Sequence, residues 1–384
     1  MIYNNTVMLN TIGAPDFDDV ESLAGSVKLS EKLIYYLAND YLEGRYRDFT
    51  VPKRSGGERM VSAPCSSLKT LQRWVLEEIL YKVKVSPYSY GFEKARNSSD
   101  KNNSNPILHL ADRHCKQLFI LKMDLKDFYP SIERKRVFAQ FLKIGYGSYA
   151  ADLLTEICTH NGSLPQGGVT SAYLANIICY HMDMRIAGYC NKRGIVYTRY
   201  ADDIIFSSDD RGALRGIYGA VRSIIEEEGF TVNDRKTRFL TPKGRKEVLG
   251  LILVNEPERD KILAPRDLKR MVRTMIHHQI ITGDYSEYSK VLGYISYIDS
   301  IERGYKEKIK KYIEKFQKDR ITMFDDAVVA FNEHRYFKDI PELEVHEPHE
   351  LFTDKNDDPE DIASDCYEER EEFVRASKKK INRR

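Results

Sequence analysis

The sequence predicts an α+β fold in which an antiparallel sheet carries helices on one face and a bundle of helices follows. Two observations lead to this prediction. Residues 118–254 alternate strand and helix patterns around a central hairpin at 195–208. From Pro265 onward, apolar residues such as Leu268, Val272 and Met275 recur at helical spacing.

Three elements are expected before this central region. Residues 1–45 form a small helical lead-in, because apolar side chains recur at helical spacing after the start signal at Ser30. Residues 46–62 alternate apolar and basic side chains around a Ser-Gly-Gly sequence, which is typical of a β-hairpin. Residues 68–83 have the pattern of an amphipathic helix.

The central region is expected to begin with a buried strand at 118–124. Three helices separate this strand from the hairpin, and one helix with short strands follows the hairpin. The expected helices span 133–143, 147–159, 171–190 and 211–229, and the short strands lie within 230–254.

Charge is distributed unevenly along the chain. The whole chain carries +2, but residues 341–373 alone carry −12, so the remaining residues carry +14. A basic body suits a polyanionic partner such as a nucleic acid, although a well-solvated surface has the same composition. Residues 341–373 lack hydrophobic periodicity, and we expect them to be disordered or ordered only by a partner.

Simple sequence features argue against several classes of protein. No run approaches about 18 uncharged apolar residues, and the N-terminus lacks the basic and apolar regions of a secretory signal. The six cysteines show no Cys-x-x-Cys spacing, which fits free thiols better than disulfides or a zinc site. We therefore expect a cytoplasmic protein that does not enter a membrane.

Three aspartates stand at the ends of predicted strands. Asp202 and Asp203 occupy the tip of the hairpin at 195–208, and Asp124 ends the strand at 118–124. Isolated buried carboxylates are costly, whereas carboxylates at strand ends can hold hard divalent cations. Each feature alone is also common in surface turns. Together they supply the acidic donors of a two-metal phosphoryl-transfer site, whose ions lie about 3.5–4 Å apart.

A loop rich in proline and glycine lies between these acidic sites. Residues 164–168 read LPQGG and precede an apolar helical pattern. Glycines allow the backbone to approach a ligand closely, and an ordinary turn at the start of a helix is the alternative.

These blocks, in this order, resemble the reverse transcriptases of bacterial retrons. The DLKDFY sequence at 124–129 is similar to the first metal motif of the family, and LPQG at 164–167 to its nucleotide-loop motif. YTRYADDIIFS at 197–207 is similar to its catalytic hairpin. The likeness extends to residues 46–59, 68–74 and 90–92, so that it covers most of the chain between residues 46 and 318.

Two marks of the retron subgroup differ in this chain. The subgroup usually has Asn-Ala-x-x-His, whereas residues 105–109 read NPILH. It also usually has Val-Thr-Gly, whereas residues 248–250 read VLG, a version that intron-encoded and other bacterial reverse transcriptases tend to show. The motifs therefore support a reverse transcriptase more strongly than they support the retron subgroup.

The resemblance implies roles for individual residues. Two magnesium ions are expected on Asp124, Asp202 and Asp203, with the Leu125 carbonyl as a further donor and Lys236 as a catalytic acid near the leaving pyrophosphate. Contacts to a deoxynucleoside triphosphate are implied for Lys53, Arg59, Asp127, Phe128, Tyr129 and Gln166. Contacts to primer and template are expected for Leu249, Gly250, Arg266, Arg270 and Arg273. The Tyr129 ring would exclude a nucleotide that carries a 2′-hydroxyl, and the alternative is that Tyr129 is an ordinary core residue. For the basic residues, the alternative is that they are ordinary surface residues.

The implied fold is that of a right-hand polymerase. It has a lead-in at 1–45, fingers and palm at 46–254, a helical thumb at 255–320 and a charged extension at 321–384. The implied activity is RNA-directed DNA synthesis that copies part of a structured non-coding RNA into DNA linked to that RNA. The implied partners are this RNA, its DNA product and an accessory effector protein, acting in defence against phage.

Two other functions are compatible with the motifs. One is a different bacterial reverse transcriptase, either intron-encoded, diversity-generating or a stand-alone defence polymerase. No maturase or endonuclease pattern follows residue 320, which argues against the intron enzyme. The other is an RNA-binding scaffold with an inactive polymerase core, against which the presence of all three aspartates argues.

Overall fold

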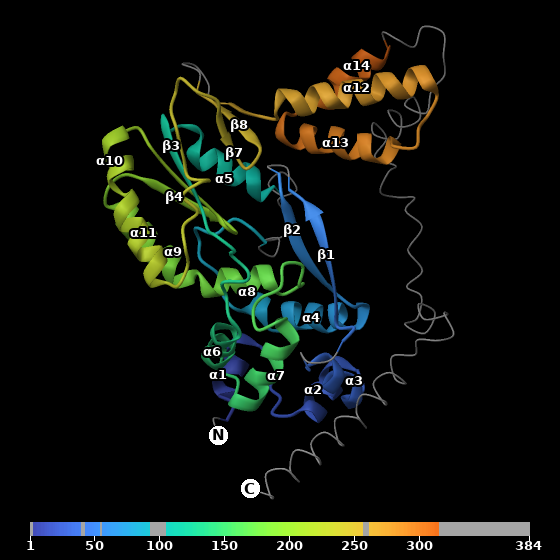
Figure 1. The fold of residues 1–384 in the computed structure, drawn as a ribbon, viewed down its shortest axis with the longest axis vertical. Helices are drawn as coiled ribbons and strands as arrows, with labels where there is room; N and C mark the ends of the chain where they lie inside the picture. The colour runs from blue at the N-terminus through green and yellow to red at the C-terminus, as the bar shows by residue number, and fades with distance from the viewer. Residues whose placement is uncertain (1–2, 40–42, 54–55, 93–104, 256–260, 315–384) are drawn as a thin grey trace, which may run out of the picture.

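The structure is a computed structural model that describes residues 3–39, 43–53, 56–92, 105–255 and 261–314 (Figure 1). The acidic segment at 341–373 and the charged extension at 321–384 lie outside the described residues. Predictions about those two segments therefore stay predictions.

Three short helices open the chain. They are α1 (Thr6–Ile12), α2 (Val20–Val27) and α3 (Glu31–Leu37), which confirms the helical lead-in. Each begins after a polar residue whose side chain accepts a backbone hydrogen bond, and these residues are Asn5, Asp19 and Ser30. The apolar faces of the three helices pack into the main core of the molecule.

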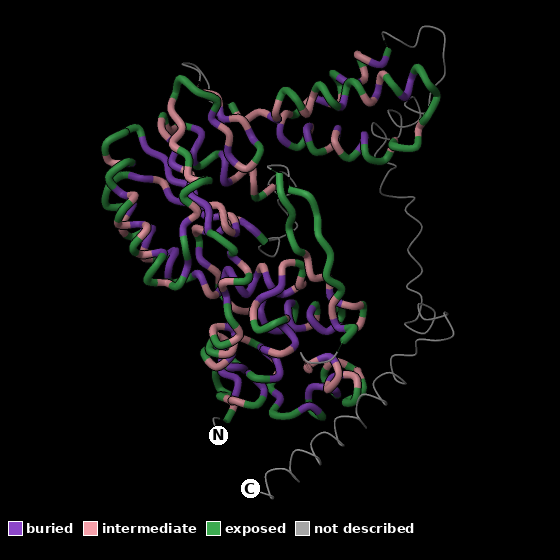
Figure 2. Tube along the Cα trace, in the orientation of Figure 1, coloured by how far each residue is buried: buried purple, intermediate pink, exposed green. Residues whose placement is uncertain are grey.

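A long hairpin follows and projects away from this core. Strands β1 (Tyr46–Pro52) and β2 (Glu58–Pro64) pair antiparallel along their whole length. Most of their side chains are exposed, as Figure 2 shows. Because the hairpin has no apolar face to bury, its position depends on contacts at its base, where helix α4 (Ser66–Glu78) and the short helix η1 (Leu80–Lys82) begin the core.

The central sheet has four strands, all antiparallel, in the order β4-β5-β3-β6. These are β3 (Phe119–Asp124), β4 (Val196–Tyr200), β5 (Asp203–Ser208) and β6 (Arg238–Leu240). This arrangement confirms the predicted α+β class. The helices around it are α6 (Arg134–Ile144), α7 (Ser148–Cys158), α8 (Ser171–Ile178), α9 (Tyr180–Asn191), α10 (Arg211–Gly216) and α11 (Tyr218–Glu227).

The helix predicted at 68–83 ends at Glu78 and is followed by the separate 3₁₀ helix η1. Two further predicted helices are also divided in the structure. The predicted helix at 171–190 is interrupted at Cys179, and the one at 211–229 at Ile217. Both residues keep a negative φ with ψ close to zero, and both are buried. The apolar pattern continues across each interruption, so hydrophobic periodicity could not reveal it.

A second, smaller sheet joins the central sheet to the last helices. It contains β7 (Lys246–Val248), β8 (Leu251–Val254) and β9 (Lys261–Leu263), and helix α5 (Pro106–Cys115) packs against β8 and β9. The Asn105 side chain accepts hydrogen bonds from two amides in the first turn of α5, and Pro106 occupies the first turn itself. Proline is favoured there because that amide needs no helical partner. The two segments that differ from the retron subgroup thus lie in one packing unit.

Three helices complete the described chain. Helices α12 (Arg266–Thr282), α13 (Tyr288–Ile301) and α14 (Tyr305–Glu314) pack around Val272, Ile295 and Ile309. They form a separate unit that stands beyond the end of the long hairpin (Figure 1). This confirms the predicted helical region. No helix in the described ranges combines the length and apolar character needed to cross a bilayer.

A buried ion pair connects the catalytic hairpin predicted from the sequence to the helices behind it. The Arg199 guanidinium donates to both carboxylate oxygens of Asp183, with Nε–Oδ1 2.7 Å and Nη2–Oδ2 2.8 Å. Both side chains are completely buried. The Tyr197 hydroxyl also donates to Asp183, and Arg199 donates further to Asn176 and to the carbonyl of Ala201. Strand β4 is thereby fixed to α8, α9 and its own turn.

We expect Arg199→Met to lower the free energy of unfolding by about 3–5 kcal/mol, because the Asp183 carboxylate would stay buried without a compensating positive charge. Chemical denaturation followed by circular dichroism measures this effect. Arg222→Met is the matched control, because Arg222 pairs with Glu226 and Asp234 on the surface and should matter little. Equal denaturation midpoints for the two variants would show that the buried pair does not stabilise the fold.

Candidate active site

The three aspartates predicted from the sequence lie at adjoining strand ends. Strands β3 and β5 pair so that Asp124 faces Asp203, and Asp202 lies in the turn between β4 and β5. The carbonyl of Asp202 accepts a hydrogen bond of 3.0 Å from the amide of Leu125, which holds the turn against the end of β3. Asp124 is 7% exposed and the other two are partly buried.

The turn that carries Asp202 has an unusual backbone conformation. Ala201 has a φ of 52°, in the left-handed region that residues other than glycine rarely adopt. Its carbonyl accepts a hydrogen bond of 3.2 Å from the buried Arg199 guanidinium. The small side chain of Ala201 permits this conformation, and the hydrogen bond to its carbonyl holds it. Because Arg199 donates that bond, it fixes the position of Asp202.

Burial and mutual repulsion make these carboxylates unfavourable as anions. Burial, followed by the charge of Asp202, raises the pKa of Asp203 to about 6. Burial also raises the pKa of Asp202, and the charge of Asp124 adds to the rise. A nearby cation favours the charged form of a carboxylate. The oxygen donors of Asp202 and Asp203, together with those of Asp124 at the end of β3, are of the type that a hard divalent cation such as Mg²⁺ prefers.

Lys236 occupies one side of this acidic group. Its ammonium lies 2.8 Å from Oδ1 of Asp124, and Asn233 donates to Oδ2 of the same carboxylate at 3.1 Å. Partial burial lowers the pKa of Lys236, but the hydrogen bond and charge of Asp124 outweigh it and raise the pKa overall. Lys236 therefore stays protonated and neutralises Asp124.

The three aspartates lie close together in the fold, but their side chains are not arranged to coordinate one metal ion. Across the described residues, no three His, Cys, Asp or Glu side chains are near enough to one another to hold a metal ion. The contact between Lys236 and Asp124 gives a physical reason. The donor types fit Mg²⁺, but Oδ1 of Asp124 can bind a cation only when the lysine moves away.

Tyr129 lies beside this acidic group, but Phe128 does not. Burial, followed by the charge of Asp202, raises the pKa of Tyr129 to about 12. Phe128 is 4% exposed, and its ring lies 5.7 Å from that of Phe230 in the core. The Phe128 ring therefore packs in the core beside Tyr129, with 5.2 Å between the two ring centres, so that a nucleotide contact would have to come from the Phe128 backbone and stays a prediction. Asp127 is exposed and has a left-handed φ of 46°.

The glycine loop packs closely against the long hairpin, and its predicted approach to a nucleotide stays a prediction. Gly167 has a φ of 132°, and a Cβ there would lie 2.5 Å from the carbonyl oxygen of Ser62 in β2. The Ser62 amide in turn donates to the carbonyl of Gln166 at 2.9 Å. The backbone that approaches Gly167 closely is thus that of Ser62 in the long hairpin. The Gln166 side chain is half-buried at this junction.

The basic residues of the long hairpin are exposed. Lys53 and Arg59 lie near its tip, and the positive charge of Arg59 counteracts part of the pKa rise of Asp202. The charge of Arg59 therefore acts on the acidic group.

The residues expected to contact primer and template lie on two other elements. Leu249 and Gly250 form the tight turn between β7 and β8, with φ values of 47° and 77°. Arg273 lies near the ring of Tyr312 in α14, with its guanidinium carbon 6.0 Å from the ring centre. Arg266 and Arg270 line a cavity next to the small sheet.

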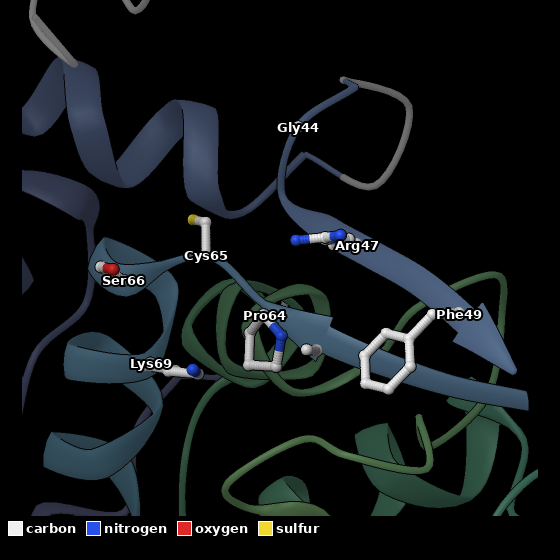
Figure 3. Close-up of a pocket in the computed structure, with 8 residues that line it drawn as sticks. Gly44, Arg47, Phe49, Pro64, Cys65, Ser66 and Lys69 are labelled. Atoms are coloured by element: carbon white, nitrogen blue, oxygen red, sulfur yellow. The ribbon is translucent and has the colours of Figure 1, made fainter. Parts of the chain in front are cut away.

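The structure also shows a cavity that the sequence analysis missed. A hollow of about 480 Å³ lies at the base of the long hairpin and is lined by Arg47, Phe49 and Lys69, with Cys65 and Ser66 at the start of α4 (Figure 3). Phe49 is 42% exposed. The spacing of Arg47 and Phe49 was the available signal, because residues two positions apart share one face of a strand.

Comparison with known proteins identifies the relatives of this chain. The reverse transcriptase (RNA-dependent DNA polymerase) family matches residues 51–263. The retron Ec86 reverse transcriptase of Escherichia coli is 36% identical over 82% of this chain and 95% of its own length. The retron Mx65 reverse transcriptase of Myxococcus xanthus is 33% identical over 69% of this chain and 64% of its own length. A telomerase structure from Candida albicans aligns with a TM-score of 0.41 at 13% identity, covering 83% of this chain and 61% of its own.

Replacing Lys236 should change the affinity of the acidic group for divalent cations. In Lys236→Met, the ammonium no longer competes for Oδ1 of Asp124, so we expect Mn²⁺ to bind roughly tenfold more tightly, a change of about 1.4 kcal/mol. Titration followed by electron paramagnetic resonance measures free Mn²⁺ directly.

Lys122→Met is the matched control for this prediction. The charge of Lys122 acts on Asp203 as that of Lys236 does, but the contact with Asp124 belongs to Lys236. If the two variants bind Mn²⁺ equally well, the change in affinity comes from the loss of one positive charge near the site. Lys236 then does not compete with the cation for Asp124.

Proposed function

The chain belongs to the bacterial retron-type reverse transcriptases, with the right-hand polymerase fold, and we propose that it copies part of a structured non-coding RNA into DNA that stays linked to that RNA. The observation that carries this proposal is the position of the aspartates. Asp124 faces Asp203 across paired strands, and Asp202 lies in the adjoining turn. The family match from residue 51 to 263 includes all three.

Asp124, Asp202 and Asp203, with the carbonyl of Leu125, would hold two Mg²⁺ ions. When bound, such ions activate an attacking hydroxyl and stabilise charge on both oxygens of an in-line displacement. The protein's own contribution is to hold the carboxylates at fixed strand ends. Burial raises the pKa of both Asp202 and Asp203, and a bound cation would favour the ionised form of both carboxylates.

Lys236 would protonate the leaving pyrophosphate. Its ammonium is already charged and lies at the edge of the acidic group, 2.8 Å from Asp124. Release from Asp124 would free it to donate a proton to the departing oxygen. General-acid catalysis of this kind typically contributes roughly 10²–10⁴-fold.

The nucleotide would lie between the acidic group and the long hairpin. The charge of Arg59 acts on Asp202, and with Lys53 this residue would bind the triphosphate through charge-assisted hydrogen bonds. Tyr129 lies beside Asp202, where its ring would meet the sugar of the incoming nucleotide. Gln166 and Asp127 would complete the polar edge of this pocket.

The hollow at the base of the hairpin would receive the single-stranded RNA template. It presents an exposed aromatic ring, Phe49, together with the basic side chains of Arg47 and Lys69 (Figure 3). Single strands are commonly bound by stacking on aromatic rings within a positively charged groove. The primer would pass the turn at Leu249 and Gly250, and Arg273 on α12 would contact the duplex backbone.

The same proposal includes a biological setting. A reverse transcriptase of a retron would act in the cytoplasm on a dedicated RNA, with an accessory effector protein in defence against phage. Deleting the gene from its host and restoring it with inactive Asp202→Asn would test this setting by plating phage. Equal protection by the active and inactive forms would rule out DNA synthesis as the basis of defence.

Asp202→Asn should abolish DNA synthesis while RNA binding stays within about threefold, because a metal ligand is lost and the basic surfaces are kept. Primer extension on an RNA template with Mg²⁺, together with a filter-binding assay, measures both. Asp18→Asn, an exposed change near α2, is the control and should extend normally. Substantial extension by the Asp202→Asn variant contradicts the assigned role.

Tyr129→Val should allow ribonucleotides to be incorporated, because the ring that would meet a 2′-hydroxyl is removed. We expect the preference for deoxynucleotides to fall by about tenfold or more, which corresponds to about 1.4 kcal/mol. The ratio of kcat/KM values for the two sugars on one RNA template measures this preference. Tyr149→Val on α7 serves as the control; an unchanged ratio in both variants would make Tyr129 a purely structural residue.

A further inference from the structure

A second pocket lies where the small sheet meets the first helix of the thumb. Its volume is about 630 Å³, within the range of about 300–1,000 Å³ that is typical of small-molecule sites. Its walls come from Leu118, the loop at 242–246, strands β8 and β9, and the first turns of α12.

This pocket is remote from the aspartates. Leu118 directly precedes β3, and Asp124 is the last residue of that strand. At about 3.3 Å per residue, the strand separates the two by about 20 Å. The pocket therefore belongs to the opposite end of the central sheet, and a ligand there would not touch the reacting groups.

The lining combines apolar walls with an excess of positive charge. Leu118 is 41% exposed, and Pro242, Ile252 and Val254 extend the apolar surface beside it. Five cationic side chains and one acidic side chain line the same pocket. An anionic ligand with an apolar body fits this combination.

Two of the cationic side chains are available for a ligand. Lys269 pairs with Glu302 at 2.8 Å, and Arg245 pairs with Glu247 at 3.1 Å. Within the described ranges, Arg266 and Arg270 form no ion pair with a carboxylate. They stand four positions apart on α12, so both guanidinium groups lie on one face of the helix.

From these observations we propose that the pocket binds an unpaired nucleotide of the RNA, outside the channel that holds template and primer. This inference rests on the proposed function. Bases in single-stranded RNA loops are splayed out and packed against apolar or guanidinium surfaces, and the guanidinium fork matches a phosphate. The base would pack on Leu118 and Pro242, and Arg266 and Arg270 would bind the adjoining phosphates.

The probe is a twelve-nucleotide single-stranded RNA that carries fluorescein at its end and one 4-thiouridine in its centre. The full chain is first saturated with an RNA-template and DNA-primer hairpin that it has extended by one chain-terminating nucleotide, so that the channel is filled. Incorporation of that nucleotide also shows whether the proposed polymerase activity is present. Anisotropy then gives the affinity of the probe, and mass spectrometry locates its photocrosslinks.

We expect crosslinks at Leu118, within 242–255 or within 261–270. Leu118→Glu should weaken probe binding about tenfold, while extension of the hairpin is unchanged. The backbone there is held by the bond from the Leu118 amide to Asp209, which the substitution keeps. Met184→Glu on α9 is the matched control, because Met184 is 40% exposed and acquires the same charge.

The double variant Arg266→Gln, Arg270→Gln provides an independent measurement. If each guanidinium neutralises one phosphate, the slope of log affinity against log salt concentration should decrease by about 1.4. The proposal is overturned if the filled channel abolishes probe binding, or if Leu118→Glu and Met184→Glu bind the probe equally. It is also overturned if a glutamate-rich peptide occupies the pocket more tightly than RNA, because the partner would then be a protein.

Discussion

The buried pair between Arg199 and Asp183 is the interaction on which the geometry of the active site depends. Two charges removed from water must satisfy each other completely, and here the guanidinium binds both carboxylate oxygens within 2.8 Å. The remaining donors of Arg199 reach Asn176 and the carbonyl of Ala201. The same side chain therefore holds two helices and the strained turn that carries Asp202. A neighbouring buried histidine, His114, adds hydrogen bonds to Thr198 and Ser207 in β4 and β5.

Charge balance explains why the acidic group is not a finished metal site. Burial and repulsion disfavour three adjacent carboxylates, and Lys236 relieves part of that cost by pairing with Asp124. This contact would link the proposed metal ligand to the proposed acid, since a cation on Asp124 would compete with the lysine. An ammonium released in this way would be free for the leaving group. Metal binding and acid catalysis would thus be coupled through one ion pair.

The two nucleic-acid sites that we propose lie at opposite ends of the strands of the central sheet. At one end, the aspartates, Tyr129 and the long hairpin surround the place proposed for the nucleotide. At the other end, Leu118 and α12 enclose a cationic pocket. The glycine loop at Gly167 fastens the exposed hairpin to the first end through the close approach of Ser62. Such an arrangement would allow the chain to hold a structured RNA while a different part of that RNA is copied.

The sequence by itself determined the α+β class, the catalytic hairpin, the strand that ends at Asp124 and the helical region after Pro265, because these depend on local periodicity and on motifs that are continuous in the chain. It could not locate the interruptions at Cys179 and Ile217, since buried apolar residues continue the pattern across both. It also could not show that Phe128 lies in the core, that Gly167 is packed against Ser62, or that Lys236 contacts Asp124. Those contacts join residues far apart in the chain, and side-chain packing and charge pairing in the folded molecule decide them. Tertiary structure alone therefore determined how the aspartates are held and which positive charges remain available to a nucleic acid.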